Sequence, residues 1–127
     1  MDYGYTKSLN SSFEAALAKT KEELRREGFG VLAEIDVRKI LKEKLDVDYE
    51  KYVILGVCNP SYAHRALKEE KMIGLLLPCN VVVREAGGSV EVSAVLPGVL
   101  MAASGNERLK EIAAQAEGKL KSAIDKI

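Results

Sequence analysis

The pattern of apolar and polar positions along the chain predicts the strands of one sheet. Five segments have the pattern of strands, namely residues 3–9, 29–35, 52–58, 80–85 and 89–95. The first alternates apolar and polar side chains, which is typical of an edge strand, whereas residues 52–58 form a continuous apolar run, which is typical of a buried strand. Gly87-Gly88 between the last two segments supplies positive φ and predicts a hairpin.

Apolar residues at helical spacing predict two long helices. The first follows Ser11, which together with Glu14 fits a capping box, and ends at Gly28 because glycine adopts the left-handed conformation without steric cost. The second follows Asn106 as its cap and keeps one apolar stripe to the end of the chain. The residues expected to be buried are Phe13, Ala16, Leu17, Thr20 and Leu24 in the first helix, and Leu109, Ile112, Ala113, Ala116, Leu120 and Ile124 in the second.

Two shorter helices are predicted between the strands. One follows Asp36 as its cap, and the other follows Asn59, with Pro60 at the first helical position, where its missing amide costs nothing. We expect each to bury an apolar side, formed by Val37, Ile40, Leu41 and Leu45 in the first and by Ala63, Ala66, Leu67 and Met72 in the second.

These elements predict one α+β domain over residues 1–127, with a single, mainly antiparallel sheet and short helices inserted between the strands. Two long helices would cover one face of that sheet. The other face is partly apolar, and this favours a partner subunit.

Composition and charge narrow the class of function. Apolar residues make up 47% of the chain and charged residues 30%, and 19 basic residues balance 19 acidic ones. A nucleic-acid-binding protein is expected to have a basic excess or a basic stripe, so we expect no nucleic-acid partner. No apolar run is long enough to span a bilayer, and no signal peptide is visible, so we expect a cytoplasmic protein with no membrane partner and with reduced cysteines.

The candidate site lies at two similar corners, Cys58-Asn59-Pro60 and Cys79-Asn80. In an antiparallel sheet the end of one strand and the start of the next lie at the same edge, so the two corners should converge. Free amides at the start of the helix after Asn59 would suit an anion. We therefore expect a binding or accessory module with a pocket for a small molecule or anion at these five residues.

The same residues leave other interpretations open. Cys58, Cys79 and His64 are thiol and imidazole groups, which would suit zinc or copper. Alternatively, Cys58 would be the nucleophile of a thiol-redox enzyme, with Cys79 as the resolving thiol. Both cysteines would equally serve as small buried hydrophobes, the commonest place for a free cysteine. A purely structural subunit acting through its exposed sheet face is a further alternative.

Four blocks of sequence resemble the family called domain of unknown function 302. They are Gly28–Leu32, Glu34–Val37, Leu55–Pro60 and Ile73–Val83, and the resemblance extends over residues 1–127. It implies a fold like that of the TATA-box-binding protein, with the order strand, helix, four strands, helix, and it implies a homodimer. It implies no established activity, and similarity of fold to a DNA-binding protein transfers no function.

Overall fold

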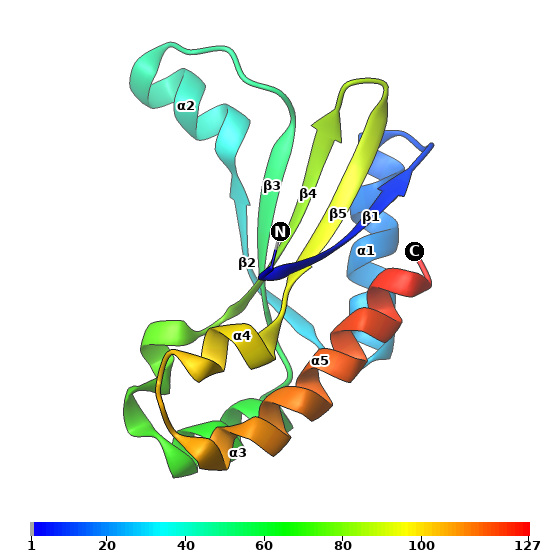
Figure 1. Cartoon of the computed structure of the whole chain (residues 1–127). Helices are drawn as coiled ribbons and strands as arrows, with labels where there is room; N and C mark the ends of the chain where they lie inside the picture. Colours follow the sequence, from blue (N-terminus) through cyan, green and yellow to red (C-terminus); the bar gives the residue numbers. More distant parts are fainter. Residues whose placement is uncertain (1) are drawn as a thin grey trace.

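The computed structural model describes residues 2–127 and shows an α+β fold built on one five-stranded antiparallel sheet (Figure 1). The strands are β1 (Gly4–Leu9), β2 (Gly30–Asp36), β3 (Tyr52–Cys58), β4 (Cys79–Ala86) and β5 (Ser89–Val95). Their order across the sheet is β1-β5-β4-β3-β2. The predicted fold class, the five strands and the edge position of the first strand are therefore confirmed.

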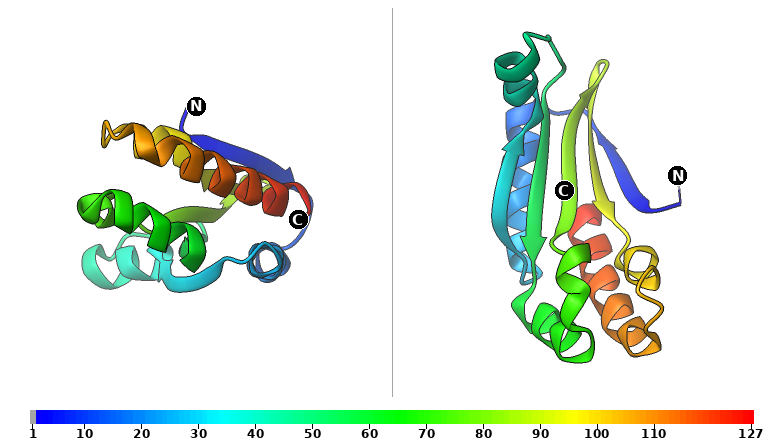
Figure 2. Two further views of the ribbon diagram at one scale, coloured as in Figure 1. Left: turned by 90° about the horizontal axis from the view of Figure 1, so that it is seen from below. Right: turned by 90° about the vertical axis from the view of Figure 1, so that its left-hand side faces the viewer.

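Two long helices cover one face of the sheet, as predicted (Figure 2). They are α1 (Phe13–Arg26) and α5 (Lys110–Asp125). Between the strands lie α2 (Val37–Leu45), α3 (Pro60–Glu69), the 3-10 helix η1 (Lys71–Leu76), α4 (Pro97–Ala102) and the 3-10 helix η2 (Glu107–Leu109). α3, η1 and α4 gather beyond one end of the sheet, beside the N-terminal half of α5 (Figures 1 and 2).

The buried apolar residues form two clusters, and α5 belongs to both. The main core fills the space between the sheet and the two long helices, where Leu55, Val81, Val92, Leu24 and Leu120 are each at most 1% exposed. The second core lies under the short helices and consists of Ala66, Ile73, Met101, Leu109, Ile112 and Ala113. Every residue of the predicted α5 stripe is buried, so that stripe is confirmed.

The ends of the long helices follow the predicted signals with one change. The N-cap of α1 is Ser12 and not Ser11: the Ser12 hydroxyl oxygen accepts a hydrogen bond from the Ala15 amide at 3.1 Å. Gly28 follows α1 with φ of 88°, as a C-terminal glycine should. The Asn106 side chain accepts from the Arg108 amide at 3.0 Å and caps η2, which leads directly into α5.

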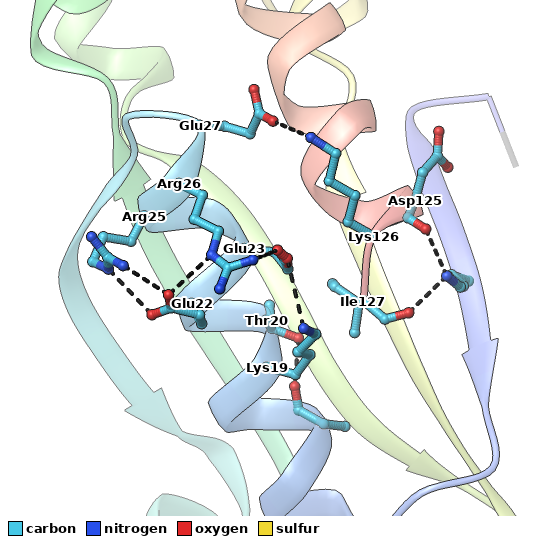
Figure 3. A network of polar contacts seen from close by, with 12 residues as sticks. Lys19, Thr20, Glu22, Glu23, Arg25, Arg26, Glu27, Asp125, Lys126 and Ile127 are labelled. Atoms are coloured by element: carbon cyan, nitrogen blue, oxygen red, sulfur yellow. Dashed lines mark hydrogen bonds and ion pairs between the residues drawn. The ribbon is translucent and has the colours of Figure 1, made fainter.

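Polar contacts fix the last turn of α5 against both α1 and β1 (Figure 3). Lys126 Nζ donates to Glu27 Oε2 at 3.0 Å, at the C-terminal end of α1. Lys7 of β1 donates from its Nζ to the carbonyl oxygens of Asp125 at 2.9 Å and Ile127 at 2.7 Å. Because these contacts join three elements that are distant in sequence, they hold the two long helices side by side over the sheet.

The prediction of buried sides for the short helices is partly wrong. None of the residues of α2 is buried, and Leu45 is 66% exposed. In the second short helix, α3, Ala66 is buried but Leu67 is 42% exposed. Met72 lies beyond the end of α3, in η1, and is 64% exposed. The apolar pattern identifies the apolar side of a helix. It does not ensure that another part of the same chain covers that side. α2 projects from the sheet after β2, and within the chain its main neighbour is β3 (Figure 1).

Within residues 2–127, no helix combines the length and the apolar character that crossing a membrane would require.

Candidate functional site

A cavity of about 310 Å³ lies where the two apolar cores meet. Its walls come from the ends of β3 and β4, from α3 and α4, and from the N-terminal half of α5. Phe29, Val57 and Cys79 contribute from the main core, and Met101 and Ile112 from the second core. A volume of this size is in the range of small-molecule sites.

Both cysteines line this cavity, because they sit at the matching ends of adjacent strands. Cys58 is the last residue of β3, and Cys79 is the first residue of β4. In the β3–β4 ladder the partner of Cys79 is Val57, the residue before Cys58. Cys79 is buried, whereas Cys58 is partly exposed. Asn59 follows Cys58 in the same wall, so the structure brings together three of the five residues in the predicted pocket.

Two of the helices that line the cavity each contribute two alanines. Ala63 and Ala66 line it from α3, and Ala113 and Ala116 line it from α5. A methyl group extends little beyond the helix backbone, so helices that meet through alanines leave space that leucines would fill. The cavity therefore follows from the choice of small residues on both helices.

The mouth of the cavity is bordered by exposed leucines. Leu32 lies at an irregularity in the β2–β3 pairing between Val31 and Ala33, and such a bulge redirects the side chain of the extra residue. Leu32 is 69% exposed and Leu67 is 42% exposed, yet both line the cavity. Apolar surface thus continues from solvent to the closed end.

Asn59 stands at the N-cap of α3, but its side chain does not cap that helix. It makes no capping hydrogen bond, and its Nδ2 instead donates to the carbonyl oxygen of Glu27 at 3.4 Å. A Cβ on Gly28 would lie 3.0 Å from the same Nδ2, so the absence of a side chain at residue 28 allows this close approach. Asn59 therefore joins the end of α1 to the start of α3 and fixes one wall of the cavity.

The other predicted site residues lie elsewhere. Pro60 is exposed and does not line the cavity, although it occupies the first position of α3 as predicted. Asn80 is exposed on the sheet face opposite the long helices and lines a separate hollow there. Side chains alternate between the two faces along β4, and here Cys79 is buried under the helices while Asn80 is exposed on the open face.

The proposed metal ligands Cys58, Cys79 and His64 are not assembled. His64 is exposed and lies outside the cavity, because it is displaced around α3 from Ala63 and Ala66. Among residues 2–127 no three His, Cys, Asp or Glu side chains come together in a group that could hold a metal ion. The arrangement of donors therefore gives no support to a zinc or copper site in this chain.

The environment of the two thiols keeps them protonated at neutral pH. Burial raises the pKa of the Cys58 thiol. Burial, with a smaller contribution from the nearby Cys58, raises the pKa of Cys79 to about 11. A catalytic or redox-active cysteine needs a lowered pKa, since the thiolate is the nucleophile. The site therefore does not favour the thiol-redox enzyme that the sequence left open.

The open face of the sheet carries a different arrangement. Arg84 lies between two carboxylates and donates to Glu50 at 3.0 Å and to Glu91 at 2.7 Å. Tyr49 and Tyr52 pack at a centroid distance of 6.3 Å beside this triad. Together with Asn80 they border an open hollow of about 500 Å³ that is lined by both polar and apolar side chains.

Comparisons with known proteins place the chain in a family. The family model described as "Domain of unknown function DUF302" matches residues 5–127. The chain belongs to this family. It is also similar to a solved protein described as an uncharacterized conserved protein DUF302 from Bacillus stearothermophilus, with 35% identity, a TM-score of 0.92 and coverage of 99% of this chain and 98% of that one. No curated protein matches the chain.

The sequence did not predict that residues of α4 and α5 would line the cavity of this DUF302 protein. Met101, Ile112, Ala113 and Ala116 come from α4 and α5, far along the chain from the two cysteines, and only tertiary packing brings them there. The pattern did identify the three α5 residues as buried. The signal that could have suggested a cavity is that alanines occupy the buried side of two different helices.

The raised pKa of Cys79 leads to a testable prediction for stability at alkaline pH. The folded-state value of about 11 exceeds the reference value of 9.0, so folding favours the protonated thiol. This contribution is fully present below pH 9 and is lost as the pH rises through 11, by up to about 2–3 kcal/mol. In urea unfolding between pH 8 and pH 11, the free energy of unfolding of the wild type should fall relative to that of Cys79→Val, which has no thiol at this position. A stability difference between the two proteins that does not change with pH would contradict the assignment.

Proposed function

We propose that this protein is a binding or accessory module that holds a small organic molecule in the cavity between the two apolar cores. The observation that carries the proposal is the cavity itself, which strands and helices from both cores line and which reaches solvent past Leu32 and Leu67. Protein interiors are normally close-packed, and a void of this size forfeits contact energy unless something occupies it. The protonated thiols support a binding role rather than covalent chemistry by this chain.

A fluorescent probe and a thiol reagent together test this proposal. Naphthol is neutral at pH 7, and its emission changes when it leaves water; because the chain has no tryptophan, the probe can be excited without interference from the protein. We expect a saturable change in emission with one naphthol per chain. Because Cys58 lines the cavity and is partly exposed, bound naphthol should also slow its alkylation by iodoacetamide.

The control is the protein unfolded in urea, where naphthol should leave the alkylation rates of both thiols unchanged. Absence of saturable binding would overturn the proposal. Saturable binding without protection of Cys58 would also overturn it, since the probe would then occupy some other part of the surface.

We also propose that the open sheet face and α2 form the contact between two copies of the chain. Exposed apolar side chains run along this region: Ile35, Ile40, Leu45, Val47 and Tyr49 are between 42% and 66% exposed. A helix of nine residues is marginal on its own in water, so α2 needs a surface to cover it.

Charge favours a second copy as the occupant of this surface. α2 carries Arg38, Lys39, Lys42 and Lys44 with only one acidic residue, Glu43. On the open face, Arg84 is outnumbered by the paired carboxylates of Glu50 and Glu91. The basic helix of each copy would therefore face the acidic centre of the other, and this is self-complementary about a two-fold axis. The order of the elements also supports the proposal of a TATA-box-binding-protein-like fold.

Sedimentation tests the dimer. The wild type is expected to sediment as a dimer at micromolar concentration, and Leu45→Glu should raise the dissociation constant by at least about tenfold, because a charge then enters an apolar contact. Leu75→Glu is the matched control, since Leu75 is 78% exposed in η1, away from α2. A wild type that remains strictly monomeric at micromolar concentration would overturn the proposal.

A further inference from the structure

The cavity walls define the chemical class of the ligand. Resting on the proposed function, we infer that the cavity binds an uncharged, mainly aliphatic or aromatic molecule of about a dozen non-hydrogen atoms, because an apolar cavity of about 150 Å³ accommodates benzene and this one is about twice as large. The inference depends on the size of the cavity, on the charge of its lining and on the position of its few polar groups.

The lining carries no formal charge. Among the residues that the structure describes, no Asp, Glu, Lys, Arg or His lines the cavity, and nearly all of its surface is carbon or sulfur. Both thiols remain neutral at pH 7, because burial disfavours their ionised form. A charged group on the ligand would lose its hydration without gaining an ion pair, and this costs binding free energy.

The polar groups of the site are few and lie toward one side. Asn59 and Tyr62 are the only lining residues with an amide or hydroxyl side chain, and both stand at the start of α3. The Asn59 Nδ2 is already engaged with Glu27 O, so its Oδ1 is the group left to accept from a ligand. A single hydroxyl at one end of the ligand would match this arrangement, with the rest of the molecule against the alanines.

One feature of the fold would favour an anion instead. The first amides of α3 follow Asn59, and a helix N-terminus attracts negative charge. A fatty acid could then place its carboxylate at α3 and its chain in the cavity. The apolar lining opposes this arrangement, so the affinities for a neutral and an anionic ligand of the same length decide between the two.

Calorimetric titration of the wild-type protein with three ligands of one chain length tests the inference. Decanol is neutral, decanoate is anionic and decylammonium is cationic. Decanol is used below its solubility limit, and the two charged analogues are used well below the concentrations at which they form micelles. We expect decanol to bind with one site per chain and at least roughly tenfold more tightly than either charged analogue.

The outcomes distinguish failure of the inferred ligand class from failure of the proposed binding function. Binding of decanoate as tight as that of decanol would overturn the inference of a neutral ligand and assign the carboxylate to the start of α3, while leaving the cavity as the binding site. Tight binding of decylammonium would overturn the neutral class as well. If naphthol protects Cys58 but none of the three decyl ligands binds, the inferred ligand class fails while the proposed function stands. If naphthol does not protect Cys58, the proposed function itself fails.

Discussion

Ala116→Leu is expected to abolish ligand binding while leaving the protein folded and somewhat more stable. Ala116 is 8% exposed and lines the cavity from α5, so a leucine there projects into the space that a ligand would occupy. We expect the dissociation constant for decanol to rise on the order of a hundredfold, since the larger side chain removes much of the free volume. Filling a cavity commonly raises the free energy of unfolding by about 0.5–2 kcal/mol.

Ala114→Leu is the matched control for this variant. It makes the same substitution on the same helix, but Ala114 is exposed and does not line the cavity between the cores. Calorimetry should show less than about a twofold change in its affinity, and urea unfolding should show a change within about 0.5 kcal/mol. If Ala116→Leu bound decanol as tightly as Ala114→Leu, the cavity would not be the ligand site.

Leu120→Ala is expected to lower the free energy of unfolding by about 2–5 kcal/mol, the range for truncation of a leucine in a close-packed core. Leu120 is 1% exposed and lies in the main core between α5 and the sheet. Because the small domain has a limited total stability, a loss of this size should shift the urea midpoint strongly.

Leu75→Ala provides the comparison for the core variant. Leu75 is 78% exposed in η1, so the same truncation should change the free energy of unfolding by less than about 0.5 kcal/mol. Equal losses in the two variants would contradict the assignment of α5 to the main core.

Local patterns were sufficient to predict most of the fold. Residues 52–58 form β3 with the predicted bounds, and residues 80–85 lie within β4, where Val81 and Val83 alternate onto the buried face. Gly28 ended α1 as expected. In these cases the signal acts over a few residues, through backbone conformation or the two-residue period of a strand, so the sequence alone contains it.

The predictions that were wrong concern contacts between elements that are distant in the sequence. α2 has an apolar side, but nothing in its own sequence says which surface covers it, and in the single chain Leu45 remains exposed. Asn59 had the sequence signature of a cap, yet its amide reaches the end of α1, because folding brings Glu27 beside it. Such a partner, more than thirty residues away, has no local signature.

Some features of the candidate site could be predicted from the sequence, and others depend on contacts between distant elements. The convergence of Cys58 and Cys79 followed from antiparallel strand order, and the structure places both on one cavity. Asn80 lies on the open face of the sheet, as the alternation after the buried Cys79 indicates. The alanines of α5 could not be assigned to the site in advance, because only the packing of α5 against α3 makes them its opposite wall.

Alanine methyl groups can report whether an apolar molecule occupies the space between the two cores, because four of them line that space. In protein labelled at these methyl groups, a naphthol titration monitored by NMR should shift the signals of the four cavity alanines, Ala63, Ala66, Ala113 and Ala116, through the ring current of the bound probe. The exposed Ala15 and Ala18 of α1, which do not line the cavity, should keep their positions. Shifts confined to Ala15 and Ala18, or no shifts at a saturating concentration of naphthol, would show that the molecule does not bind between the two cores.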